Sequence, residues 1–168
     1  LSLVTDRNIA SRSKLAHDPD SIQGIIMRRF ILAAVAALAI STPLLANIGR
    51  VKSARGAAEV QRGAEKLVVS SGLVLEKGDI ISTRGQSRVG ITFVDNTRIA
   101  LAANSRIVIT KFEYNDTFQT GTFEAEVQKG EAAIIGGLIS KSGPKAMIVR
   151  TPKSAFAVRG ARIVVTVK

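Results

Sequence analysis

Hydrophobic and polar residues alternate along most of the chain after residue 46. In segment 87–93, Val89, Ile91 and Phe93 fall on one side of an extended chain, and polar or small residues fall on the other. The same alternation recurs in two further segments, which cover residues 97–101 and 122–127. A period of two residues is typical of strands that bury one face and expose the other.

Shorter runs that are rich in β-branched residues predict further strands. They cover residues 58–60, 67–69, 80–83, 107–112, 132–135, 147–149 and 163–167. Residues that favour turns separate them, at positions 77–79, 84–85, 95–96, 115–116, 129–130 and 142–144. About ten short strands without a convincing helix predict an all-β domain over residues 47–168, either a jelly-roll-like β-sandwich or a β-roll. A β-helix would share this patterning, but the segment shows no fixed-period repeat.

The preceding segment has the order of a secretory leader. Residues 27–46 begin with Met-Arg-Arg-Phe, continue as an apolar run, and end in Ser-Thr-Pro-Leu-Leu-Ala, with the small residue Ala46 before the expected cut. This order predicts a helical signal peptide cleaved after Ala46, and therefore a periplasmic or secreted protein. The alternative is an uncleaved inner-membrane anchor facing the periplasm, although the run is interrupted before the roughly 20 residues that span a bilayer.

Residues 1–26 are largely polar and mixed in charge. We interpret them as an over-extended start or a disordered tail, with translation beginning at Met27. A short cytoplasmic tail on an anchored protein is the alternative.

The composition argues against catalysis and against a metal site. The chain has no Cys, and its one His, His17, lies outside the predicted domain. Thiolate chemistry, disulfides and a Ser-His pair are therefore excluded from the domain, and we expect no cofactor and no metal. Ser142 and Lys145 have the spacing of an acyl-enzyme motif, but the Gly-Pro between them predicts a loop where that motif needs a helix.

The chain is strongly basic. Its formal net charge is +11, and residues 47–168 hold 19 Lys and Arg against 10 Asp and Glu, a net charge of +9. Such a surface attracts nucleic acid, anionic lipid or acidic polysaccharide alike. The basic residues are scattered and only Tyr114 offers a phenol, while Phe93 and Phe123 are predicted inward, which argues against nucleic acid as the partner.

Five sequence blocks, in order, resemble the FecR domain, an extracytoplasmic β-domain associated with signalling to extracytoplasmic-function sigma factors. The blocks cover residues 49–58, 75–83, 89–107, 149–152 and 158–161. The second reads LEKGDIIST, and the last two contain Thr-Pro and Val-Arg-Gly. Asn96-Thr97 and Ala161 depart from the Gly-Ser and Thr usual in the family. The resemblance implies a fold consistent with the strand pattern.

The resemblance implies a binding or regulatory role. Sigma-regulating members carry a cytoplasmic segment, a membrane helix and a further domain, so we expect a free-standing FecR-type module instead. Its predicted function is non-enzymatic binding of an envelope protein, with transmembrane signalling as the process in which this binding would act. The alternative is a structural or carbohydrate-binding module that docks on acidic envelope polysaccharide through its basic face.

Eight positions of these blocks are candidate site residues with a structural role: Gly78, Asp79, Asp95, Asn96, Thr151, Pro152, Arg159 and Gly160. Gly78-Asp79 and Asp95-Asn96 predict turns that tolerate positive φ and are stabilised by side-chain oxygens. Gly160 is expected to permit a close backbone approach or a bulge in the last strands. Arg159 allows two interpretations. It is either a core-facing partner of a carboxylate such as Asp79, or a solvated side chain.

Overall fold

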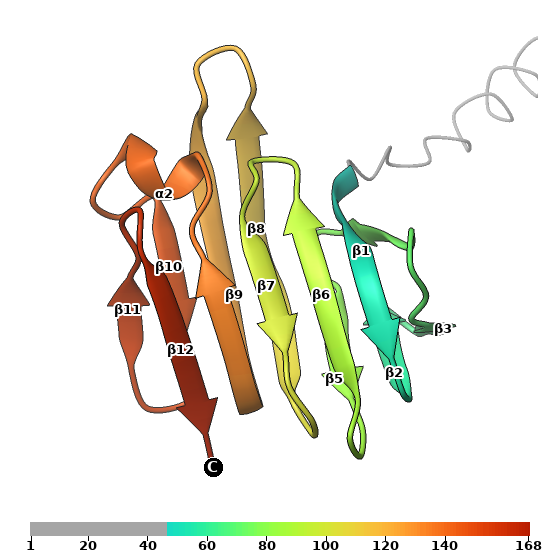
Figure 1. Cartoon of the computed structure of the whole chain (residues 1–168). Coiled ribbons are helices and arrows are strands. Elements are labelled where there is room, and N and C mark those ends of the chain that lie inside the picture. Colours follow the sequence, from blue (N-terminus) through green and yellow to red (C-terminus); the bar gives the residue numbers. More distant parts are fainter. Residues whose placement is uncertain (1–46) are drawn as a thin grey trace, which may run out of the picture. The chain divides into compact units, whose positions relative to one another are not determined.

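The computed structural model describes residues 47–168, so the predicted signal peptide at 27–46 and the segment 1–26 lie outside the described residues. Figure 1 shows the described strands and a single short helix. In chain order they are β1 Asn47–Arg55, β2 Ala58–Arg62, β3 Glu65–Val68, β4 Val74–Glu76, β5 Ile80–Thr83, β6 Arg88–Phe93, β7 Arg98–Leu101, β8 Arg106–Asn115, β9 Thr120–Ile135, α2 Ile139–Ser142, β10 Met147–Arg150, β11 Ala155–Ala157 and β12 Arg162–Val167. No helix in this part of the chain has the length and apolar character needed to cross a membrane.

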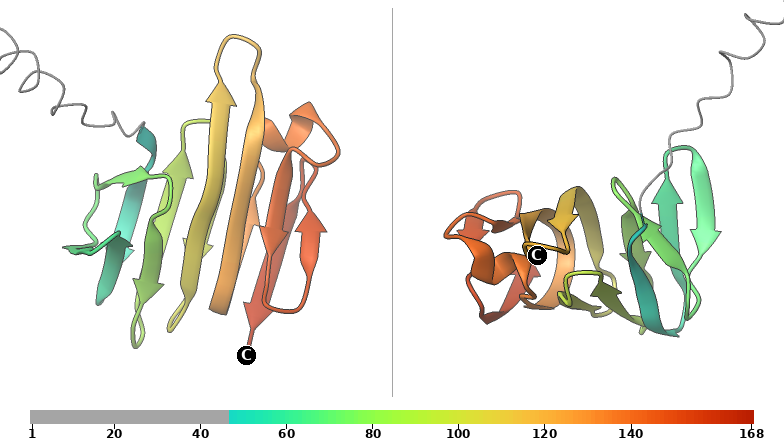
Figure 2. Two further views of the ribbon diagram at one scale, coloured as in Figure 1. Left: turned by 180° about the vertical axis from the view of Figure 1, so that it is seen from behind. Right: turned by 90° about the horizontal axis from the view of Figure 1, so that it is seen from above.

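The strands form two layers that are joined by β9 (Figure 2). We call the layer β4-β1-β6-β7-β9-β12 sheet A, and the layer β3-β2-β5-β8-β9-β10-β11 sheet B. The first half of β9 pairs with β8 and β10, and its second half pairs with β7 and β12. The predicted all-β sandwich is therefore confirmed, as a curled double layer of mainly antiparallel strands.

The core lies between the two sheets. Phe93 of sheet A packs against Phe112 and Phe123 of sheet B, with ring centroids 5.6 and 5.0 Å apart. The alternation read from the sequence is confirmed here, because Val89, Ile91 and Phe93 are each at most 2% exposed. Aliphatic side chains fill the rest of the core, as expected from a chain with few aromatic residues.

One predicted turn is wrong. Lys129-Gly130 does not separate two strands, because β9 continues through it and passes from sheet B to sheet A at that point. Gly130 has φ +78°, and a Cβ there would lie 2.5 Å from the Cα of Ser105. A residue without a side chain therefore lets one strand bend between two sheets, where the sequence pattern indicates two strands and a turn.

Other elements escaped the pattern analysis. The strands β4 and β11 have only three residues each, too few for a period to be visible. The helix α2 ends at Ser142, where a loop was expected, and the Ser142 hydroxyl donates a hydrogen bond to the carbonyl of Ile139 at 2.8 Å. This hydrogen bond lies within the last turn of α2, and Ser142 is the last residue of that helix.

One edge of the sandwich is closed by the chain itself. The segment after β3 crosses from sheet B to sheet A: Val69 donates its backbone N–H to Ala58 of β2, and Gly72 donates to Val51 of β1. Val69 is buried at 6% exposure. We call this side, formed by β2, β3, β4 and the connecting segment 69–73, the closed edge.

Candidate binding surfaces

Asp79 lies fully buried at the turn between β4 and β5, beside the closed edge. Gly78 before it has φ +92°, and the Asp79 carboxylate accepts a hydrogen bond from the Glu76 backbone N–H at 2.8 Å. Arg62 donates from Nε and Nη2 to the two oxygens of Asp79, at 2.9 and 2.8 Å, and from Nη1 to Glu76 at 2.7 Å. The hydrogen bonds to Asp79 raise the pKa of Arg62 above its ordinary value. This network ties β2 of sheet B to β4 of sheet A.

The hypothesis that Arg159 pairs with Asp79 is wrong. Arg159 is exposed on the loop between β11 and β12, and Arg62 occupies both oxygens of Asp79. The alternative interpretation of Arg159, a solvated side chain, agrees with its position. Arg62 was missed because it lies 17 residues from Asp79 at the end of another strand, and no local motif links the two.

Asp95 is fully buried in the turn between β6 and β7. Its Oδ1 accepts the Thr97 N–H at 3.0 Å, and its Oδ2 accepts the Thr97 hydroxyl at 2.7 Å and the Ile139 N–H at 3.3 Å. Asn96 next to it has φ +66°. The carboxylate thus stabilises its own turn, as predicted, and also anchors α2, which the sequence did not indicate.

The remaining motif residues lie in two further turns. Thr151 accepts the Ser154 N–H on its hydroxyl at 3.0 Å, in the turn between β10 and β11 that also contains Pro152. Gly160 has φ +58° and donates its N–H to the Ser140 hydroxyl at 3.3 Å. The eight candidate positions therefore occupy four separate turns, and two of these residues, Thr151 and Pro152, line a pocket.

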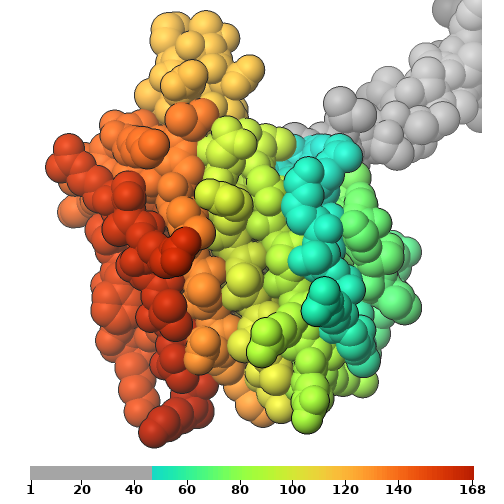
Figure 3. All heavy atoms as spheres, viewed as in Figure 1, coloured from blue at the N-terminus to red at the C-terminus, as the bar shows by residue number. Residues whose placement is uncertain are grey.

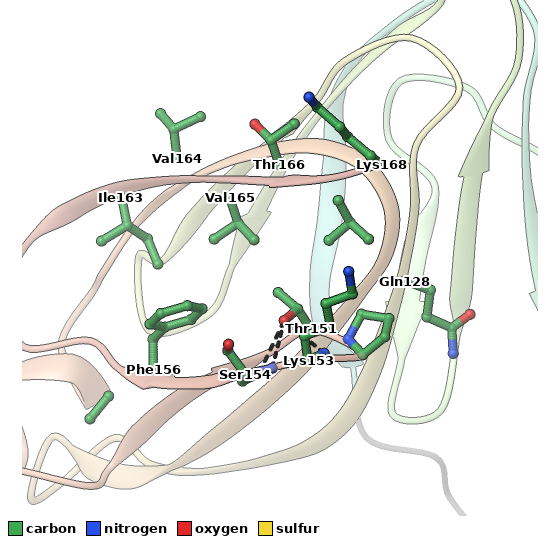
Figure 4. Close-up of a pocket in the computed structure, with 13 residues that line it drawn as sticks. Gln128, Thr151, Lys153, Ser154, Phe156, Ile163, Val164, Val165, Thr166 and Lys168 are labelled. Atoms are coloured by element: carbon green, nitrogen blue, oxygen red, sulfur yellow. Dashed lines mark hydrogen bonds between the residues drawn. The ribbon is translucent and has the colours of Figure 1, made fainter.

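That pocket is an open groove of about 790 Å³ between β11 and β12 (Figure 4). These two strands lie on the opposite side of the fold from β2 and β3 of the closed edge (Figure 1). Phe156 points from β11 toward Ile163 and Val165 of β12. Phe156 is 47% exposed, so this apolar wall is only partly covered. We call it the edge groove, and its lining is mainly apolar, with Lys153 and Lys168 as its charged members.

A second surface is the outer face of sheet A, toward which Figure 3 looks. Six exposed cations project from it, and we call it the basic face: Arg50, Lys52, Arg55, Arg88, Arg98 and Arg162. Within residues 47–168, no ion pair joins any of the six to a carboxylate. Their positive charges therefore face solvent without an ion-pair partner among the described residues.

The sheet B side differs. There Arg84 pairs with Glu59 at 2.9 Å, and Arg150 pairs with Glu124 at 3.2 Å. Two exposed arginines on this side are thus paired with carboxylates, whereas the six cations of the basic face are not.

A comparison with known protein families identifies the family of this chain. A family model described as FecR protein matches residues 79–168, which is more than half of the chain. The match contains every residue that lines the edge groove, and it excludes β1 with its part of the basic face. No curated protein and no solved structure matches the chain.

Proposed function

The chain belongs to the FecR family, and on this premise we propose that it is a non-enzymatic regulatory module of the bacterial envelope that binds a protein partner on its periplasmic side. The family is one of regulatory signalling proteins, which favours binding over catalysis. The observation that carries the proposal is the edge groove, because it is an apolar pocket built wholly from the part of the chain that the family match covers.

The apolar surface of the groove makes its burial by a partner energetically favourable. Phe156 keeps 47% of its surface exposed beside Ile163, which is itself only partly buried. Removing apolar surface from water contributes about 25 cal/mol per Å². Covering this wall with a partner's side chains would therefore favour association.

The two strands that flank the groove have free edges. Among the described residues, β11 pairs with β10 alone and β12 pairs with β9 alone. A free edge presents unpaired N–H and C=O groups, to which an extended peptide can add as another strand. We assign this role to β12, because it has six residues whereas β11 has three.

The lining defines the chemistry of the partner segment. An extended peptide places alternate side chains on opposite faces, so apolar residues at every second position would enter the groove. Lys153 and Lys168 are the charged lining residues, so carboxylates beside the apolar positions would complement them. The proposed ligand is an extended segment of an envelope protein with alternating apolar residues and flanking Asp or Glu.

The test places a photo-crosslinking residue at position 156 or 118 of the full chain in cells. Phe118 serves as the matched control, because it is a more exposed phenylalanine, at 74%, in the hairpin between β8 and β9. We expect position 156 to crosslink one envelope protein through an extended acidic and apolar segment. The purified partner should then bind the Phe156→Ser variant about tenfold or more weakly, since a buried aromatic anchor contributes about 1.4 kcal/mol or more.

Three results would overturn the proposal. The first is crosslinking at position 118 but not at position 156. The second is equal loss of binding in the Phe118→Ser and Phe156→Ser variants. The third is a crosslink from position 156 to a second copy of this chain, which would make the groove a self-association site.

A further inference from the structure

We propose that the basic face binds a linear acidic polysaccharide, whose carboxylates are contacted by Arg50, Arg98 and Arg162. This site lies on the outer surface of sheet A and does not depend on a protein partner in the edge groove. The sequence suggested such a ligand only from net charge. The strand register now supplies a defined row of residues.

The register places the three arginines in one row across the sheet. Arg50 lies opposite Thr92, and Thr92 lies opposite Arg98. Arg98 in turn lies opposite Ile135, which lies opposite Arg162. Neighbouring strands are about 4.8 Å apart, so the arginines recur at a spacing of about 10 Å along the row. A guanidinium binds a carboxylate through two parallel hydrogen bonds, which suits one acid group at each position.

A trough runs beside this row. The next row across the sheet consists of small residues, with Gly90 opposite Ala100 and Ala100 opposite Ala133. These small residues form the floor of a hollow of about 440 Å³, and Lys52 also lines this hollow. Arg55 and Arg88 pair with each other in the row beyond, so both sides of the trough carry cations at its β1 end.

Two carboxylates also belong to this side of sheet A and limit the site. Glu76 of β4 accepts a hydrogen bond from Arg62 at 2.7 Å, and Arg62 shares its positive charge between Glu76 and Asp79. Glu131 is exposed on β9, two residues from Ala133, and marks the boundary of the cationic trough. The remaining outward charges are positive, which leaves the row of Arg50, Arg98 and Arg162 open to an anionic chain.

The geometry favours a polysaccharide over the other polyanions. In an extended linear polysaccharide with an acid group on each sugar, such as polygalacturonate, every second acid group faces the same side, at a spacing comparable to that of the arginines. Its extended chain also fits a trough that crosses strands. Double-stranded DNA carries one charge per about 1.7 Å, far denser than this row. Binding of single strands depends on aromatic stacking, and the outward positions of sheet A in the described chain hold no aromatic residue.

A membrane surface fits less well. Stable attachment of a protein to lipid requires apolar side chains that enter the interface together with the charge. The described part of sheet A offers few such side chains: Val164 of β12 is 61% exposed, and Val94 after β6 and Val74 of β4 are 47% and 37% exposed. Anionic vesicles are therefore an arm of the test, with weaker binding expected than for polysaccharide.

The experiment measures binding of the purified full chain to polygalacturonate, with fully methyl-esterified polygalacturonate as the uncharged counterpart. The test variant is Arg98→Gln combined with Arg162→Gln. The matched control is Arg84→Gln combined with Arg150→Gln, which removes the same charge from exposed arginines on the sheet B side. Anionic vesicles and duplex DNA complete the set of ligands, and thermal melting verifies that each variant is folded.

We expect the test variant to bind polygalacturonate about tenfold more weakly, because two exposed ion pairs contribute up to about 1.4 kcal/mol together. The control should lose less than about twofold, and binding should weaken on going to physiological salt of about 0.15 M. The Phe156→Ser variant should bind polygalacturonate like the unaltered chain, which keeps this test separate from that of the edge groove. Equal losses in the two double variants would overturn the proposal. So would tighter binding of DNA or vesicles than of polygalacturonate, or equal binding of the esterified polymer.

Discussion

The two edges of the sandwich differ in how far they cover apolar surface. At the closed edge, the segment 69–73 crosses between the two sheets. Arg62 of β2 also donates hydrogen bonds there to the carboxylate of Asp79, at the turn between β4 and β5. At the opposite edge, the loop 158–161 also passes from β11 of sheet B to β12 of sheet A, with Val158 buried at 2% exposure, but Phe156 remains 47% exposed between the two strands. The comparison teaches that one edge is built for stability, whereas the other keeps apolar surface and free strand edges available for contact.

The largest expected effect follows from removing Arg62. In the Arg62→Met variant, the fully buried carboxylate of Asp79 would lose its cationic partner, and the stability loss should be about 3–5 kcal/mol. Urea unfolding of the full chain measures it. Arg62→Lys serves as the control and should lose less, because it keeps the charge and gives up the two-pronged geometry. A loss below about 1 kcal/mol in Arg62→Met would contradict the view that this network closes the edge.

A smaller effect is expected from the crossing segment. Val69 is 6% exposed, so the Val69→Ala variant should lower the free energy of unfolding by about 2 kcal/mol through lost burial. The matched control is Val68→Ala, because Val68 is the neighbouring residue and is 84% exposed. If both variants lost the same stability, the segment would not be part of the core.

The smallest effect on stability is expected at the edge groove. Phe156→Ser should change the free energy of unfolding by no more than about 1 kcal/mol, since the side chain is half exposed before any partner binds. The same urea titration compares it directly with Val69→Ala. A loss at Phe156 larger than that at Val69 would mean that the groove wall supports the fold, and the contrast between the two edges would fail.

The sequence pattern succeeded wherever a structure depends on neighbours along the chain. The predicted strand 80–83 has the same bounds as β5, and the inward residues of segment 87–93 are buried as expected. The turn aspartates Asp79 and Asp95 do bond to backbone groups of their own turns. Alternation and turn chemistry act over a few residues, so they can be read directly from the sequence.

The candidate surfaces could be predicted only in part. Thr151 and Pro152 were selected for their motif, and they line the edge groove, but the groove itself arises from the approach of β11 to β12. The net charge indicated a basic surface, but it did not place Arg98 in one row with Arg162. That row depends on pairing registers through β9, and a shift of one residue would turn these side chains to the other face.

The sequence by itself determined the all-β class, the order of most strands and which side of each strand faces the core, because hydrophobic periodicity is local. Only the tertiary structure decided that Arg62, and not Arg159, binds Asp79, and that β9 runs through Gly130 into a second sheet. It also decided that one edge of the sandwich is closed while the other is open. The physical reason is that each of these features depends on contacts between residues far apart in the chain, and those contacts are chosen by strand register and packing as a whole.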